Sequence, residues 1–98
     1  MTQFRVLLRG ANFLMDVDGK PTRIGFFTTR FVQANNRDGA ELLAIDLIRS
    51  DKWLRGTVSN SPSDPPGIFA EEVEVVEGAH DAGVGSGFSF FPMDGSDA

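Results

Sequence analysis

The sequence predicts an α+β domain in which an antiparallel sheet of three to four strands packs one α-helix on one face. Residues 4–10, FRVLLRG, alternate apolar and polar side chains with the period of two that is typical of a half-buried strand. Residues 40–48 instead repeat apolar side chains at the three- and four-residue spacing of an amphipathic helix. The length of 98 residues and the absence of cysteine indicate one small domain that folds without disulfides.

The first two strands are expected to form a hairpin. Residues 12–17 extend the first strand after a bulge at Gly10-Ala11, because glycine relieves backbone strain at such sites. Asp18-Gly19 indicates the turn, since glycine adopts positive φ at little cost in a tight hairpin. Residues 22–34 then form a long second strand of β-branched and aromatic side chains, antiparallel to the first.

The single predicted helix has two candidate N-caps. Asn36 is one, and Asp38 is the other because Asp38 and Glu41 have the spacing of a capping box. The helix is expected to weaken over residues 52–55 and to stop at Gly56, a residue type favoured at helix C-termini. Its buried stripe is predicted to consist of Ala40, Leu43, Ala44, Leu47 and Ile48.

Two further strands are expected after a loop. Residues 59–67 contain three prolines, which fix φ and remove hydrogen-bond donors, so that this segment cannot join the sheet. Residues 68–76 form the third strand, and residues 88–93 form a short aromatic fourth strand beyond a glycine-rich segment. The single domain therefore spans residues 1–93 in the order β-β-α-β-β, and residues 94–98 are expected to be a disordered tail.

The charges are divided between the two halves of the chain, which has a net charge of −5. Residues 1–55 contain all nine basic residues, whereas residues 56–98 contain eight acidic residues and no basic one. A right-handed crossover places the third strand beside the first and antiparallel to it. Two arginines then lie across from two glutamates, so that ion pairs within one fold explain the asymmetry. The residues concerned are Arg5, Arg9, Glu72 and Glu74. An acidic tail that competes with a polyanion is the alternative.

The chain has more apolar surface than one helix covers. It contains nine Phe, and in the second strand Phe26 points one way while Phe27 and Phe31 point the other. An exposed apolar patch on a small protein usually marks an interaction surface. We therefore expect a homodimer that stacks these faces, or one in which the last strand is exchanged between protomers; another protein is a further possible partner. The candidate interaction surface consists of Phe27, Arg30, Phe31, Phe88, Phe90 and Phe91.

Binding of single-stranded nucleic acid is an alternative function for the same strand. Residues 23–31 loosely resemble an aromatic strand of the RNA-recognition motif, in which Phe27 and Phe31 would stack on bases and Arg30 would contact phosphate. The spacing departs from that motif, and the net charge of −5 opposes binding to a polyanion. By analogy with small acidic immunity proteins, a second alternative is an inhibitor whose acidic run at 71–77 neutralises another protein.

The sequence contains no pattern of a catalytic, metal or cofactor site. With no cysteine and a single histidine, His80, one chain cannot form a thiolate or multi-histidine metal site. Residues 16–19 resemble the start of a calcium loop, but Phe27 stands where that loop needs a bidentate glutamate. His80 beside Asp81 has no nucleophile nearby, and residues 83–87 lack the spacing of a dinucleotide-binding motif. We therefore expect a non-enzymatic protein without metal or cofactor.

The expected location is the cytoplasm. The N-terminal segment MTQFRVLLRG lacks the apolar core of a signal peptide. No apolar run approaches the ~20 residues that span a bilayer, so no membrane contact is expected.

The chain resembles a group of small uncharacterised bacterial proteins. The residues that carry the resemblance are GFFTTRFVQA at 25–34, SDPP at 63–66, GFSFFP at 87–92, NFL at 12–14 and VDG at 17–19. The pattern covers nearly all of residues 4–93. The resemblance implies a standalone single-domain protein and supplies no catalytic residue.

Overall fold

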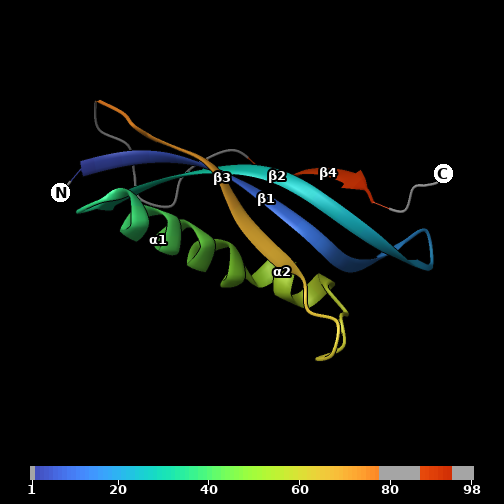
Figure 1. Cartoon of the computed structure of the whole chain (residues 1–98). Helices are drawn as coiled ribbons and strands as arrows, with labels where there is room; N and C mark the ends of the chain where they lie inside the picture. Colours follow the sequence, from blue (N-terminus) through green and yellow to red (C-terminus); the bar gives the residue numbers. More distant parts are fainter. Residues whose placement is uncertain (1, 78–86, 94–98) are drawn as a thin grey trace.

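The computed structural model describes residues 2–77 and 87–93. In this part of the chain a four-stranded antiparallel sheet of order β3-β1-β2-β4 carries two helices on one face (Figure 1). The elements are β1 (Thr2–Val17), β2 (Lys20–Ala34), α1 (Arg37–Arg49), α2 (Lys52–Thr57), β3 (Gly67–Val75) and β4 (Ser89–Pro92). The α+β class and the place of the third strand beside the first are confirmed.

β1 and β2 form the predicted hairpin, which is the longest pairing of the sheet. Asp18 and Gly19 make the turn with φ of 52° and 81°, the left-handed values that a tight two-residue hairpin requires. The strand register shifts between Gly10 and Phe13, so the predicted bulge is present. Asn12 lies in this bulge with φ of 62°, a conformation that asparagine tolerates better than most residues do.

The hydrophobic core lies between the sheet and the two helices. Side chains alternate along β1 and β2, so that most residues on the helix side are buried and most on the opposite side are half-buried or exposed. The small side chains of Ala40 and Ala44 are fully buried and let α1 approach the sheet closely. The main contributors to the core are Phe4, Val6, Leu8, Phe13, Met15, Ile24, Phe26, Val32, Ala40, Ala44, Ile48, Leu54 and Val73.

Asn36, one of the two predicted N-caps, is the N-cap of α1. The Asn36 side chain accepts a hydrogen bond of 2.8 Å from the Gly39 backbone N–H. The predicted buried stripe was wrong at two positions, because Leu43 and Leu47 are 46% and 38% exposed. The axis of α1 lies over the line of Ala40, Ala44 and Ile48, which leaves the other two leucines on the flank of the helix.

The structure also corrects the prediction of one helix that weakens beyond residue 52. α1 ends at its C-cap Ser50, and a second helix, α2, starts from Asp51. The Asp51 carboxylate accepts a hydrogen bond of 2.9 Å from the Leu54 backbone N–H. The new direction places Leu54 in the core, so burial of this leucine stabilises the break between the helices.

Several expectations fall on residues outside the described ranges. These are the tail at 94–98, the linker at 78–86 through which the last strand could be exchanged, and His80. Among residues 2–77 and 87–93, no helix is long and apolar enough to cross a membrane.

Candidate functional site

The structure divides the six predicted surface residues between the two faces of the sheet. Phe27, Phe31 and Phe91 lie on the face that neither helix covers, here called the open face. The same face carries Arg5, Leu7 and Arg9 of β1, Thr29 of β2, and Phe69, Glu72 and Glu74 of β3. Phe88, Phe90 and Arg30 lie on the helix side. The six residues therefore do not form one surface.

A row of side chains crosses all four strands of the open face. Arg9 of β1 pairs with Phe69 on one side and with Phe27 on the other. The Arg9 guanidinium lies 4.7 Å from the centre of the Phe69 ring, a cation–π contact. The rings of Phe27 and Phe91 are 5.5 Å apart, and the Phe91 ring occupies the space where a side chain at Gly25 would stand. Glycine at position 25 thus lets two aromatic rings lie side by side.

Ion pairs line the β3 side of the open face. Arg5 donates hydrogen bonds to Glu74 at 2.6 Å and to Glu72 at 3.3 Å, as the strand order predicted. The hydrogen bond with Glu74 raises the pKa of Arg5, and the same bond lowers the pKa of Glu74. Arg9 contacts Glu71 at 3.4 Å rather than the predicted Glu72 or Glu74, because the register of β1 and β3 shifts between Leu7 and Leu8.

A second group of aromatic rings lies on the helix side, next to α2. Trp53 stacks on Phe88 with ring centres 6.1 Å apart and lies 5.8 Å from the ring of Phe90. The buried Phe26 contacts the edges of the same two phenylalanines. Trp53 was not predicted to take part in any surface because the helix was expected to weaken at this point. It is 55% exposed, so the group reaches the surface.

Arg30, a member of the predicted interaction surface, lies on the helix side of β2. Its guanidinium donates hydrogen bonds to the Thr28 hydroxyl at 2.6 Å and to the Thr29 carbonyl at 2.8 Å. It also lies 5.4 Å from the centre of the Phe88 ring. Partial burial lowers the pKa of Arg30, and the charge of Asp51 opposes this effect. Arg30 therefore cannot act together with Phe27 on one nucleic-acid surface.

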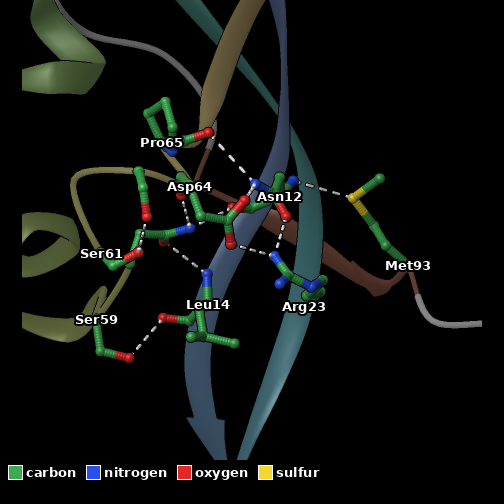
Figure 2. A network of polar contacts seen from close by, with 10 residues as sticks. Asn12, Leu14, Arg23, Ser59, Ser61, Asp64, Pro65 and Met93 are labelled. Atoms are coloured by element: carbon green, nitrogen blue, oxygen red, sulfur yellow. Dashed lines mark hydrogen bonds and ion pairs between the residues drawn. The ribbon is translucent and has the colours of Figure 1, made fainter.

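Figure 2 shows a polar network that fixes the proline-rich loop, residues 59–66, to the bulge of β1 at Asn12. The Asn12 side-chain amide donates to the Asp64 carboxylate at 2.9 Å and to the Pro65 carbonyl at 3.3 Å. The Arg23 guanidinium of β2 donates one hydrogen bond to the side-chain oxygen of the same Asn12 and another to the Asp64 carboxylate at 2.7 Å. The sequence motifs at 12–14 and 63–66 are thus brought together in space.

Asn60 completes the network from the loop side. Its amide nitrogen donates to the Asn12 and Asp64 carbonyls, each at 2.8 Å, and its amide oxygen accepts from the Leu14 N–H at 2.8 Å. Met93, directly after β4, joins the network because its sulfur accepts a hydrogen bond from the Asn12 N–H at 3.2 Å. These partners were not predicted from the sequence, because no local pattern around Asn12 or Asn60 indicates a contact between residues 48 positions apart.

The network makes the stability of the protein sensitive to acid. Hydrogen bonds from Asn12 and Arg23 lower the pKa of Asp64 below its ordinary value of 3.8. A carboxylate whose pKa is lower in the folded than in the unfolded protein stabilises the folded state at pH values above the unfolded pKa. This stabilisation is lost as the pH falls through the folded pKa. We therefore expect urea unfolding between about pH 5 and pH 2 to show a smaller loss of stability in Asp64→Asn than in the wild type. Equal losses in the two proteins would contradict this role of Asp64.

The described residues contain two further features that bear on chemistry. A hollow of about 460 Å³ lies between the helices and the proline-rich loop. Within residues 2–77 and 87–93, no three histidine, aspartate or glutamate side chains gather in a way that would hold a metal ion.

Comparisons with known proteins supply no relative. No family model matches the chain, and neither the curated proteins nor the solved structures include a significant match. Functional inference therefore rests on the geometry described above.

Proposed function

We propose that the protein is a non-enzymatic homodimer whose protomers stack the open faces of their sheets. The observation that carries this proposal is the apolar patch on a face without helices, where Phe27 and Phe69 are 39% and 45% exposed. Leu7, Phe31 and Phe91 are half-buried beside them. Apolar surface of this kind on a small domain favours association, because contact removes it from water.

The charges on the open face support a second copy as the partner. The rings of Phe27, Phe31 and Phe91 occupy the β2 and β4 side. On the other side, a rim formed by two arginines of β1 and three glutamates of β3 lies beside Phe69. When the twofold axis of the stack runs across the strands, the β3 edges of the two protomers face each other, and the arginines of one rim approach the glutamates of the other. A nucleic acid would instead need cations that are not already paired with carboxylates.

Stacking of faces is favoured over pairing of strand edges. β3 is an outer strand of the sheet, and Glu71, Glu72 and Glu74 are exposed along it. Two copies that met along this edge would place like charges side by side, which is a common protection against edge pairing. On the open face, in contrast, Glu72 and Glu74 are paired with Arg5, so their charges are balanced within each protomer.

The size of the open face predicts a dimer of moderate strength. The sheet has four strands. These strands contain 16, 15, 9 and 4 residues, and at ~3.3 Å per residue and ~4.8 Å between strands they give a face of roughly 700 Å² in projection. This is below the ~800 Å² that each partner buries in a standard interface. We therefore expect a dissociation constant in the micromolar range.

Sedimentation equilibrium across the micromolar range tests the proposal. The variant Phe27→Lys places a charge at the centre of the patch, where burial without a partner is costly. It should weaken dimerisation by about tenfold or more while the protein remains folded. The matched control is Leu42→Lys, which adds the same charge at a 69% exposed position on α1 and should leave the dimer unchanged.

Three outcomes would contradict the proposal. The first is a wild type that sediments as a monomer up to high micromolar concentration. The second is a Phe27→Lys variant that dimerises as strongly as the wild type, and the third is a Leu42→Lys variant that no longer dimerises. The last outcome would assign the interface to α1 instead.

A further inference from the structure

We propose that the hollow between the helices and the proline-rich loop binds an aliphatic carboxylate, with the chain inside and the carboxylate at two arginines. This site lies on the helix side of the molecule and is separate from the open face. Its volume of about 460 Å³ is within the range of small-molecule sites. The lining residues are Phe13, Ile48, Arg49, Leu54, Arg55, Val58, Asn60, Pro65, Pro66 and Ile68.

The interior of the hollow is apolar. Phe13, Ile48 and Leu54 belong to the buried core, and Val58 and Ile68 are partly buried against it. The one polar side chain among the non-charged lining residues is Asn60, and its amide is already used by the network around Asn12. The walls therefore offer a chain of carbons good packing and no further hydrogen bond.

Two arginines supply the only charges among the residues that line the hollow. Arg49 lies in the last turn of α1, and Arg55 lies in the last turn of α2. In the described part of the chain neither forms an ion pair, in contrast to Arg5, Arg9 and Arg23. Asp64, the carboxylate of the proline-rich loop, is bonded to Arg23 and Asn12. Two unpaired guanidinium groups beside an apolar hollow favour a ligand with an anionic head and an apolar body.

The walls of the hollow are held in place before any ligand arrives. Asp51 caps α2 at Leu54, and the Asn12 network fixes the loop at Asp64 and Pro65. Two adjacent prolines further restrict the loop backbone. A rigid site loses little conformational entropy when it binds, so a ligand of modest size is enough for measurable affinity.

Decanoate is a suitable probe, since a chain of about ten carbons is in proportion to the hollow. Titration followed by two-dimensional amide NMR should give saturable shifts at Leu54, Val58 and Ile68. Decanol tests the chain without the charge, and decyltrimethylammonium tests the opposite charge on the same chain. We expect decanoate to bind about tenfold or more tightly than either, because only decanoate pairs with the arginines.

The double variant Arg49→Gln and Arg55→Gln tests the role of the charges. It should weaken decanoate by about tenfold or more and leave decanol binding nearly unchanged. The matched control is Arg37→Gln with Lys52→Gln, which changes the net charge equally at two residues that do not line the hollow. The control should bind decanoate like the wild type.

The proposal would be overturned by the absence of saturable decanoate binding, by equal affinity for the cationic probe, or by undiminished binding in the arginine double variant. Phe27→Lys separates this result from the dimer proposal. Because Phe27 lies on the other side of the sheet, that variant should bind decanoate as the wild type does.

Discussion

Gly10→Ala is expected to lower the free energy of unfolding by about 3 kcal/mol, a large part of the total for a domain of this size. A methyl group at position 10 would overlap with three carbons of the Phe26 ring, at separations well below van der Waals contact. Phe26 has no exposed surface and is held by Phe13, Phe88 and Phe90, so it cannot move aside. Urea or thermal unfolding measures the effect, which should lower the melting temperature by roughly 10–20 °C.

Gly56→Ala is the matched control for this prediction. The same methyl group at position 56 meets no atom within 4 Å and lies inside α2. Alanine is a better helix former than glycine, so this variant should be more stable by about 0.5–1 kcal/mol. Combining Gly10→Ala with Phe26→Leu should cost less than the sum of the two changes, because the smaller side chain makes room. A Gly10→Ala protein as stable as the wild type would contradict the packing of Phe26 on Gly10.

Asn12→Ala should be the second most damaging substitution, with an expected loss of about 2–4 kcal/mol. The change removes the hydrogen bonds of the Asn12 side chain to Asp64, Pro65 and Arg23. It also places alanine at φ of 62°, which costs about 1 kcal/mol more than asparagine or glycine at the same position. Chemical denaturation followed by Trp53 fluorescence measures both contributions together.

Asn12→Gly separates the two contributions. Glycine also lacks the side-chain hydrogen bonds but adopts positive φ without strain. Asn12→Gly should therefore be about 1 kcal/mol more stable than Asn12→Ala and still less stable than the wild type. If Asn12→Gly were as stable as the wild type, the hydrogen bonds of the Asn12 side chain would contribute nothing, and the loop would be held by its prolines and by Asn60.

The sheet could be predicted from local signals. The alternation of β1 and the Asp18-Gly19 turn depend on residues that are near in sequence. The opposite charges of Arg5 and Glu74 depend only on two residues that are directly paired across strands. The crossover rule then placed β3 beside β1 without any knowledge of side-chain packing.

The failures share a physical cause. The break at Asp51 depends on how Leu54 reaches the core, and the exposure of Leu43 depends on where the helix axis lies over the sheet. The register of β1 and β3 shifts between Leu7 and Leu8, and this irregularity brings Arg9 into an ion pair with Glu71. Tertiary packing decides each of these features, and no local sequence pattern records it.

The candidate site was predicted in part. Alternation along β2 correctly assigned Phe26 and Phe27 to opposite faces of the sheet. The same alternation assigns Arg30 to the face of Phe26, so the prediction that Arg30 shares a surface with Phe27 was wrong. Asn12 and Asp64 are 52 residues apart in sequence, so their contact depends on the path of the loop. The arginines at the hollow were not predicted because the hollow exists only after α2 and the loop have packed.

The stacking of two open faces is tested most directly by intermolecular nuclear Overhauser effects in a mixed sample of ¹³C-labelled and unlabelled protein. The expected result is a set of contacts that link the ring protons of Phe27 and Phe91 in one protomer to the Leu7 methyl groups in the other, with none at Leu42. A dimer whose intermolecular contacts arise from Leu42 or Leu43 of α1, with none from Phe27, would contradict the proposed interface.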